Sequence, residues 1–346
     1  METKRWNMKE ETENVTNAIE QASNMIRSGE TVAFPTETVY GLGADATNES
    51  AVAKIFRAKG RPGDNPLIAH VASKSQLEGL VTGLSPMAER LIDAFTPGPI
   101  TFVLPSNGSC AMNVTANLPT IAVRIPSHPT ALKLLNVCRV PLAAPSANLS
   151  GKPSPTTADH VWNDLNGKIA GLLDDGPTGI GVESTVVDCT GDKPVILRPG
   201  GISEELIEAE IGYALMDAHH LSTSEQPHSP GMKYKHYAPA IPLWLVDGDA
   251  HHIQRVINRH QEYGARVGVM ATLETVGKVH ADRKVSLGKN LPEIAAHIYS
   301  ALRSFHSGDA DVIVCEALPE KGIGKAIMNR LKKASSEHVR YDEETK

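Results

Sequence analysis

The chain has 346 residues, a length that fits two domains better than one. Apolar residues make up 41% and charged residues 21% of it, which is enough for ordinary globular cores. The net charge of −6 and the aromatic content of 4% are the opposite of what a dedicated nucleic-acid-binding surface requires. Direct tRNA binding is therefore not indicated.

The four cysteines are far apart and include no C-x-x-C pair. This spacing argues against a zinc site or a disulfide framework and favours reduced thiols in a cytoplasmic protein. The polar N-terminus lacks the apolar stretch of a signal peptide. No run of eighteen apolar residues occurs, so we expect no membrane-spanning segment.

Short β-rich runs alternate with amphipathic runs between residues 15 and 212, which predicts one α/β domain with a sizeable sheet. Asn48 and Ser85 are typical N-caps, and Gly29 is a typical helix terminator. The predicted helices span residues 15–27, 49–58 and 86–95. The predicted strands span residues 31–34, 100–104, 121–125, 141–144, 171–173, 185–188 and 195–197.

Residues 217–239 are rich in His, Ser and Pro and have no apolar period, which is typical of a linker. After residue 239, β-rich and amphipathic runs alternate again. The predicted strands span 243–246, 267–270 and 311–315, and the predicted helices span 250–263, 291–305 and 324–333. This pattern predicts a smaller doubly wound domain. We expect domains at residues 1–215 and 241–346, joined by a linker or lid at 216–240.

Familiar nucleotide-binding signatures are missing or incomplete. There is no G-x-x-x-x-G-K-[ST], and neither Gly41-Leu42-Gly43 nor Gly322-Ile323-Gly324 completes a dinucleotide fingerprint. No H-E-x-x-H or G-x-S-x-G occurs either. The missing G-x-x-x-x-G-K-[ST] motif excludes an ordinary P-loop NTPase, and the other absences narrow the choice further.

Polar residues follow two of the predicted strands, at the edge where α/β sheets bind ligands. Residues 35–43, P-T-E-T-V-Y-G-L-G, come directly after the strand at 31–34 and are expected to form a loop. Ser146 and Asn148 follow the strand at 141–144 and are expected to point to the same side. They suit orientation of a ligand, and no His/Asp pattern marks Ser146 as a nucleophile.

Cationic residues occur at several places near these loops. Prolines and glycines in residues 59–70 predict an extended segment, in which Lys59 and Arg61 face the same way and form an anion site. The alternative is a solvated surface pair. Arg124 lies in an apolar strand and needs an anionic partner, which is either a protein carboxylate or one from a ligand.

The linker at 229–239 contains two lysines, Tyr234 and His236 between two prolines. Lysines suit phosphate, and Tyr or His can stack on adenine. We therefore expect Tyr234 and His236 to contact ATP as part of a lid. The alternative is a basic strap that only ties the domains together.

In this order, segments 35–43, 59–70, 144–148, 183–185 and 198–200 closely resemble the YrdC-like family of threonylcarbamoyl-AMP synthases. Segment 229–239 resembles the linker of that family's longer, two-domain branch. The resemblance covers residues 15–240 by motif and the rest of the chain by length and pattern only. Each motif alone is weak, but the ordered set is specific.

The resemblance implies a twisted α/β sheet with a cationic cavity, followed by the smaller Rossmann-like domain. It implies a nucleotidyltransferase that joins L-threonine, bicarbonate and ATP into threonylcarbamoyl-AMP and pyrophosphate, for threonylcarbamoyl-adenosine modification of tRNA. Mg²⁺ would accompany ATP, with no dedicated metal site in the protein. The product would pass to the tRNA threonylcarbamoyl-transferase machinery.

The resemblance also implies roles for residues at the matching positions. L-Threonine would be bound by Thr38, His70, Arg124, Ala144 and Ser184. ATP would be bound by Arg61, Asn65, Thr120, Ser146, Ser154 and Arg198. A polar tetrad of Lys59, Arg61, Ser146 and Asn148 would carry catalysis, with the two cations meeting phosphate and bicarbonate charge.

Two rival functions remain open from the sequence. A double-stranded RNA or tRNA-binding module would use the same cationic cavity, but the acidic net charge disfavours it. A carbamoyl-transferase domain of the hydrogenase-maturation type resembles the same fold. Such proteins carry zinc-finger cysteines, which this sequence lacks.

Overall fold

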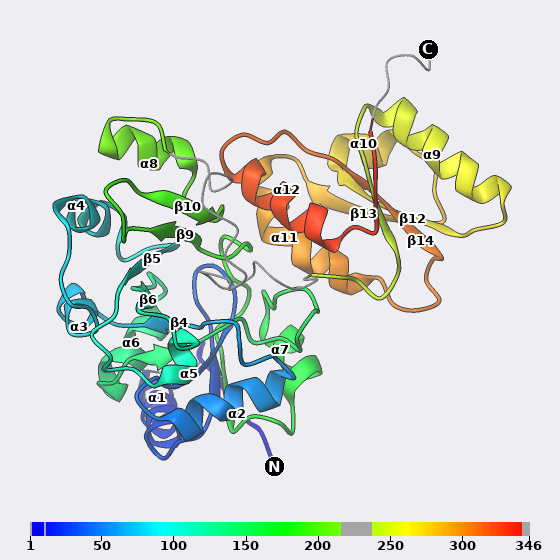
Figure 1. Ribbon diagram of the computed structural model, residues 1–346. Coiled ribbons are helices and arrows are strands. Elements are labelled where there is room, and N and C mark those ends of the chain that lie inside the picture. The colour runs from blue at the N-terminus through cyan, green and yellow to red at the C-terminus, as the bar shows by residue number, and fades with distance from the viewer. Residues whose placement is uncertain (1, 10–11, 216–236, 341–346) are drawn as a thin grey trace. The chain divides into compact units, whose positions relative to one another are not determined.

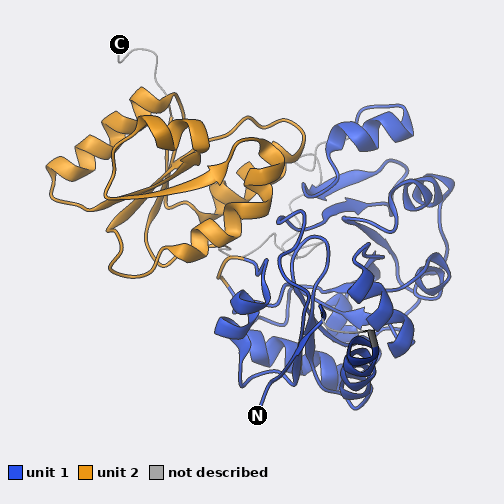
Figure 2. Ribbon diagram, turned by 180° about the vertical axis from the view of Figure 1, so that it is seen from behind, with its two compact units in different colours: residues 1–150, 154–234 blue, residues 151–153, 235–346 orange. Residues whose placement is uncertain are grey.

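The computed structural model describes residues 2–9, 12–215 and 237–340 (Figure 1). The chain divides into two compact units, residues 1–150 with 154–234 and residues 151–153 with 235–346 (Figure 2). Within the described residues, no helix has the length and apolar character needed to cross a bilayer.

The first unit is built on a ten-stranded mixed sheet, which confirms the α/β prediction. The strand order is β1-β8-β2-β3-β7-β4-β6-β5-β9-β10. The strands are β1 (Lys4–Asn7), β2 (Val32–Phe34), β3 (Gly41–Asp45), β4 (Ile68–His70), β5 (Ile100–Pro105), β6 (Thr120–Arg124), β7 (Leu142–Ala143), β8 (Gly171–Asp174), β9 (Thr185–Asp188) and β10 (Val195–Arg198). The helices are α1 (Thr12–Arg27), α2 (Glu49–Lys59), α3 (Lys74–Glu78), α4 (Pro86–Phe95), α5 (Met112–Thr115), α6 (Pro129–Cys138), α7 (Ala158–Leu165) and α8 (Glu204–Ile211).

Apolar side chains cover both faces of this sheet. In β2, Val32 and Phe34 belong to one buried cluster, which also holds side chains of α1 and α6. Ala33, between them, faces a larger cluster that includes side chains of α2, α4 and α7. This alternation fits a strand with a helical layer on each side.

Local signals account for the helix ends. Asn48 Oδ1 accepts hydrogen bonds from the N–H groups of Ser50 and Ala51 and caps α2. Ser85 caps α4, and Pro86 occupies its first turn. Both predicted starts are confirmed.

Two local predictions are wrong. Residues 59–61 are not extended, because α2 continues through Lys59 and Gly60 ends it at φ 62°. Gly41–Asp45 is strand β3 rather than loop, and it pairs antiparallel with β2. The loop after β2 is therefore the short turn of a β2–β3 hairpin. In addition, strand β1, which adds a parallel edge strand beside β8, was not predicted.

The second unit contains a five-stranded sheet of order β13-β12-β14-β11-β15, in which all pairs are parallel. Its strands are β11 (Leu243–Val246), β12 (Val267–Thr272), β13 (Arg283–Gly288), β14 (Val312–Glu316) and β15 (Glu337–Val339). Its helices are α9 (Ala250–Glu262), α10 (Leu273–Lys278), α11 (Leu291–Ser304) and α12 (Ile323–Ala334). Val269 packs against α9 on one face, and Gly268 faces Phe305 after α11 on the other. This confirms the doubly wound prediction.

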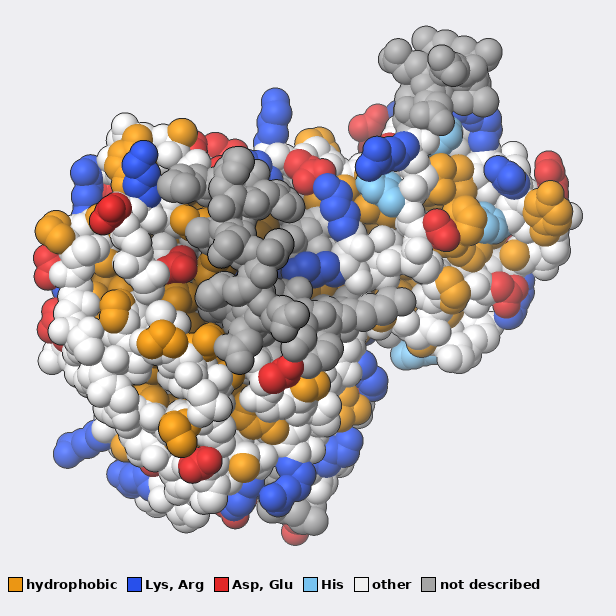
Figure 3. Space-filling view, viewed as in Figure 1, with side chains coloured by type: hydrophobic (Ala, Val, Ile, Leu, Met, Phe, Trp, Pro, Cys, Tyr) orange, Lys and Arg blue, Asp and Glu red, His pale blue; other side chains and the backbone are white. Residues whose placement is uncertain are grey.

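Charged side chains of both signs are intermixed on the face of the molecule seen in Figure 3. All four cysteines are buried and free. Burial raises the pKa of Cys110 to about 11 and that of Cys189 to about 12, so neither thiol ionises near neutral pH. Neither is a candidate nucleophile.

Candidate active site

The turn between β2 and β3 is fixed by its own threonines. Thr36 Oγ1 accepts hydrogen bonds from the N–H groups of Thr38 and Val39 at 3.2 and 3.3 Å. It also donates to Val39 O at 2.7 Å, so the 2.8 Å contact between the Thr36 and Thr38 hydroxyls uses the proton of Thr38. The hydroxyl of Thr38 is therefore oriented before any ligand arrives.

Arg124, at the end of β6, has a protein carboxylate as its partner. Its Nη2 donates to Glu37 Oε1 at 2.6 Å, and the two side chains are 4% and 13% exposed. Its Nη1 donates to Thr38 Oγ1 at 2.9 Å, and its Nε to Gly98 O at 3.4 Å. A guanidinium has five N–H donors, so two of them make no contact with the described residues.

The ion pair keeps Glu37 charged. Burial alone would raise the pKa of Glu37, but the guanidinium of Arg124 holds it below its ordinary value. The backbone N–H groups of Glu37 and Ser127 act in the same direction. At neutral pH the turn therefore presents a carboxylate and a guanidinium side by side.

His70 is neutral in this site. It ends β4, opposite Arg124 in the parallel β4–β6 pair. Burial, and then the positive charge of Arg124, lower its pKa to about 3. Its Nδ1 lies 3.2 Å from Ile68 O, where a protonated Nδ1 donates. His70 is thus suited to hydrogen bonding and not to proton transfer near pH 7.

Lys59, the last residue of α2, anchors the loop after β7. Its buried ammonium donates to the backbone oxygens of Ser146 and Asn148, the latter at 2.6 Å, and lies 3.5 Å from Asn148 Oδ1. Ser146 Oγ donates to Asn148 Oδ1, so these two side chains are adjacent as predicted. Three of the four predicted catalytic residues form one cluster.

Arg61, the fourth predicted catalytic residue, contacts the segment that contains Asn65 and Pro66. Its Nη2 lies 3.4 and 3.3 Å from the backbone oxygens of Asn65 and Pro66. Asn65 is 1% exposed, and its Oδ1 accepts no hydrogen bond from the described residues. Arg61 and Asn65 thus form a second polar cluster.

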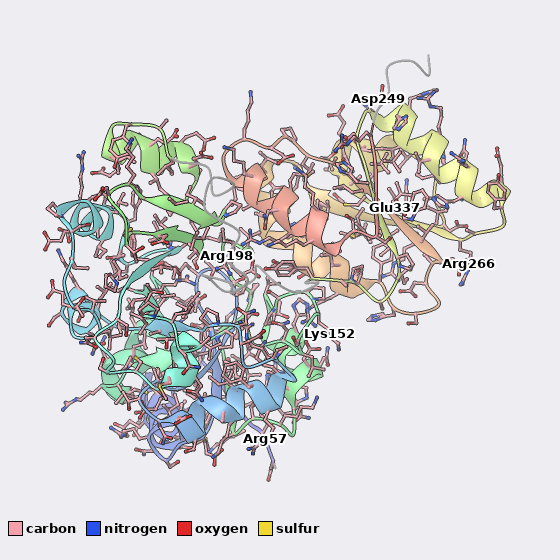
Figure 4. All side chains as sticks on the ribbon, viewed as in Figure 1. Arg57, Lys152, Arg198, Asp249, Arg266 and Glu337 are labelled. Carbon is pink, nitrogen blue, oxygen red and sulfur yellow. The ribbon has the colours of Figure 1, made fainter. Side chains whose placement is uncertain are left out.

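A third cluster surrounds the start of β9. Arg198, labelled in Figure 4, ends β10 and donates through Nη2 to Ser184 O at 2.9 Å and Ser184 Oγ at 3.1 Å. Ser184 Oγ also contacts Thr101 Oγ1 at 2.8 Å. Ser154 Oγ donates to Glu183 Oε1 at 2.6 Å. A Cβ on Gly200 would lie 2.2 Å from Thr185 N, so only glycine lets this segment approach.

Backbone hydrogen bonds join these loops around the β2–β3 turn. Tyr40 O accepts from Ala147 N at 2.8 Å, and Tyr40 N donates to Pro155 O at 2.9 Å. Thr38 O accepts from Gly181 N at 3.1 Å, and Glu37 O from Ile180 N at 2.9 Å. The turn therefore draws together the loops that carry Ser146, Ser154 and Ser184.

The remaining predicted residues are less informative. Ala144 is buried beside the site, with its N–H donating to Ile68 O at 2.9 Å, and contributes no polar side chain. Thr120 is half-buried at the start of β6. Tyr234 and His236 lie outside the described residues. The sequence motifs include Glu37 and Glu183, but neither glutamate was predicted to have a role of its own in the site.

Among the described residues, no group of three His, Cys, Asp or Glu side chains is placed to hold a metal ion. The site instead offers Lys59, Arg61, Arg124 and Arg198 with hydroxyl, amide and carboxylate groups. Fold and site together define a two-domain α/β protein whose candidate site is rich in cationic, hydroxyl and amide side chains.

Comparisons with known proteins specify the family. The family model of Sua5, YciO and YrdC, described as telomere recombination, matches residues 24–200. A model described as the C-terminal domain of threonylcarbamoyl-AMP synthase matches residues 202–336. The chain belongs to the family of threonylcarbamoyl-AMP synthases.

Curated relatives support this over nearly the whole chain. A threonylcarbamoyl-AMP synthase of Bacillus subtilis is 52% identical over 98% of this chain and 99% of its own length. One of Pyrococcus abyssi is 48% identical over 92% of this chain and 94% of its own length. The crystal structure of P. abyssi Sua5 complexed with L-threonine superposes with a TM-score of 0.91 at 44% identity, covering 99% of this chain and 100% of that one.

Proposed function

We propose that this protein makes threonylcarbamoyl-AMP from L-threonine, bicarbonate and ATP, releasing pyrophosphate, for threonylcarbamoyl-adenosine modification of tRNA in the cytoplasm. The observation that carries the proposal is the β2–β3 turn. Its backbone bonds gather the motif loops of this family, and its side chains hold Arg124. The 52% identity over 98% of the chain to a threonylcarbamoyl-AMP synthase supports the same reaction.

L-Threonine is assigned to the side of the site near Arg124. The two N–H donors that Arg124 does not use within the protein suit a carboxylate. Thr38, His70, Ala144 and Ser184 complete the proposed pocket. A relative from P. abyssi is known complexed with L-threonine, which supports this assignment.

ATP is assigned to the two arginines Arg61 and Arg198 and to the neutral polar residues Asn65, Thr120, Ser146 and Ser154. Asn65 Oδ1, buried without a partner among the described residues, suits an adenine or ribose donor. Lys59 acts by holding the Ser146–Asn148 loop in place. Mg²⁺ enters with ATP as part of the substrate, since Mg²⁺ is commonly held mainly by substrate phosphates.

The proposed chemistry is nucleotidyl transfer in two steps. The threonine amine adds to the carbon of bicarbonate with loss of water and gives a carbamate. A carbamate oxygen then attacks the α-phosphorus of ATP, the bond from that phosphorus to the bridging oxygen breaks, and pyrophosphate leaves. Positioning and charge stabilisation suffice for such a transfer, which agrees with the site's composition. The mixed anhydride would pass to the tRNA threonylcarbamoyl-transferase machinery.

Pyrophosphate release is expected to require both L-threonine and bicarbonate, because the nucleophile is assembled from the two. The measurement is pyrophosphate formation from MgATP, with each co-substrate omitted in turn, and mass spectrometry of the nucleotide product. Equal ATP cleavage without L-threonine, or formation of ADP and phosphate, would show that the proposed reaction is wrong.

Tyr234 and His236 are proposed to contact ATP from the linker. Stacking on a base is worth about 1–3 kcal/mol, so the Tyr234→Ala/His236→Ala double variant should raise the KM for ATP about tenfold or more. The KM for L-threonine should change little. Steady-state kinetics with each substrate varied checks this, and a wild-type KM for ATP would leave the linker as a simple tether.

A further inference from the structure

The carboxylate of Glu37 is only half used by the protein. Oε1 accepts the hydrogen bond from Arg124 at 2.6 Å, whereas Oε2 is buried and accepts no hydrogen bond of good geometry from the described residues, although the backbone N–H groups of Glu37 and Ser127 lie near the carboxylate. A buried acceptor without a partner costs about 1–3 kcal/mol, and more when it is charged. Such an atom in a binding site indicates that a ligand supplies the missing donor.

The charges of the pair restrict which ligand fits. Arg124 has two unused N–H donors, and Glu37 has one unused oxygen. A simple anion would be attracted by Arg124 and repelled by Glu37 at the same place. A zwitterion satisfies both groups, with its carboxylate on the guanidinium and its ammonium on the carboxylate.

The turn holds Glu37 ready for this contact. Its backbone O accepts from Ile180 N at 2.9 Å, and the side chain of the next residue, Thr38, is bound to Arg124. The Glu37 side chain is therefore constrained through both its backbone and its Oε1. A constrained acceptor loses little entropy when a ligand binds.

We infer that Glu37 Oε2 binds the α-ammonium of L-threonine and so selects α-amino acids over hydroxy acids and simple carboxylates. This inference rests on the proposed function and adds a specificity-determining residue to the same pocket. The lowered pKa of Glu37 fits this role, because a weak base binds an ammonium without removing its proton. Glu37 is thus a positioning residue and not the base that frees the amine.

The test pairs a change in the residue with a change in the ligand. Glu37→Gln keeps an oxygen for Arg124 but replaces the second oxygen by an N–H₂ group, which does not accept a hydrogen bond from an ammonium. Isothermal titration calorimetry is run with L-threonine and with 2,3-dihydroxybutanoate, in which a hydroxyl replaces the amine. Glu49→Gln, which alters an exposed carboxylate in the first turn of α2, is the matched control.

We expect Glu37→Gln to weaken L-threonine binding at least tenfold, with 2,3-dihydroxybutanoate changed less than twofold and the control variant unchanged for both. Equal weakening for both ligands would show that Glu37 acts only through Arg124, which overturns the inference. Unchanged binding of both would also overturn it.

The wild-type protein gives an answer even if the variant does not fold. The inference requires it to bind L-threonine at least tenfold more tightly than 2,3-dihydroxybutanoate, and equal affinities would overturn the ammonium contact. Binding of neither ligand would overturn the proposed L-threonine site together with this inference. A failure of Glu37 alone and a failure of the proposed function are thus distinguished.

Discussion

Arg124→Ala is expected to destabilise the folded protein by about 3–5 kcal/mol at pH 7, because it leaves Glu37 buried without its counter-charge. The pair is 2.6 Å apart and its side chains are 4% and 13% exposed, so solvent does not replace the lost guanidinium. Chemical denaturation followed by circular dichroism measures the difference. The variant should also lose L-threonine binding.

The effect should depend on pH with a definite sign. In the wild-type protein the pKa of Glu37 lies below its ordinary value of 4.5, so its stabilisation is present above that value and is lost as pH falls through the folded pKa. In Arg124→Ala, unopposed burial would raise that pKa, and protonation would relieve the penalty. The stability gap between the two proteins should therefore begin to narrow above pH 4.5, where Glu37 of the variant takes up its proton, and should narrow further as the wild-type protein loses stability below pH 4.5.

A surface ion pair provides the control for Arg124. Arg90 contacts Glu210 at 2.8 Å, but the two side chains are 58% and 34% exposed. Exposed ion pairs contribute about 0–1 kcal/mol to the free energy of unfolding. Arg90→Ala should therefore lower that free energy by less than about 1 kcal/mol, both at pH 7 and in acidic solution. Similar losses in both variants would show that burial of the Arg124 pair has no special importance.

Lys59→Ala is expected to lower the rate of adenylate formation about a hundredfold, equivalent to about 3 kcal/mol of transition-state stabilisation. The ammonium holds the backbone oxygens of Ser146 and Asn148, so its removal frees the loop that carries both side chains. Arg61→Ala should cause a loss of similar size through the charge that it presents to phosphate. Single-turnover pyrophosphate release measures both effects.

The control for Lys59 lies on the same helix. Lys54 pairs with Glu30 at 2.7 Å in a partly exposed position, away from the Ser146–Asn148 loop. Lys54→Ala should keep wild-type kinetics, and thermal melts should show all three variants folded at the assay temperature. Wild-type rates in folded Lys59→Ala would remove this residue from the mechanism.

Local chemistry made the regular elements predictable. The caps at Asn48 and Ser85 and the alternation in the second unit depend on neighbours in sequence, and the structure agrees with them. Strand β3 was missed because Gly41–Asp45 has little intrinsic β propensity and is held by pairing with β2 and β7. Residues 59–61 were wrongly predicted to be extended. Gly60 adopts a left-handed conformation that ends helix α2 at this point, and the sequence was interpreted as the start of an extended segment.

The site was predictable as a set of residues but not as a set of contacts. Sequence left two partners open for Arg124, and the choice of Glu37 depends on a contact between residues 87 positions apart. Lys59 was predicted to meet phosphate and bicarbonate charge, but its hydrogen bonds to the Ser146–Asn148 loop were not predicted. Such pairings follow from the fold of the sheet and leave no mark in residue spacing.

The backbone bonds of the β2–β3 turn also have a consequence for synthesis of the chain. Tyr40 emerges early from the ribosome, but its partners Ala147 and Pro155 and the Gly181 that binds Thr38 all emerge much later. Non-local contacts of this kind form only after the intervening chain is present. A nascent chain therefore exposes this turn, with its charged and polar side chains, for most of the translation of the first unit. Early termination before Gly181 should therefore yield polypeptides in which this turn lacks its late partners and the site is incomplete.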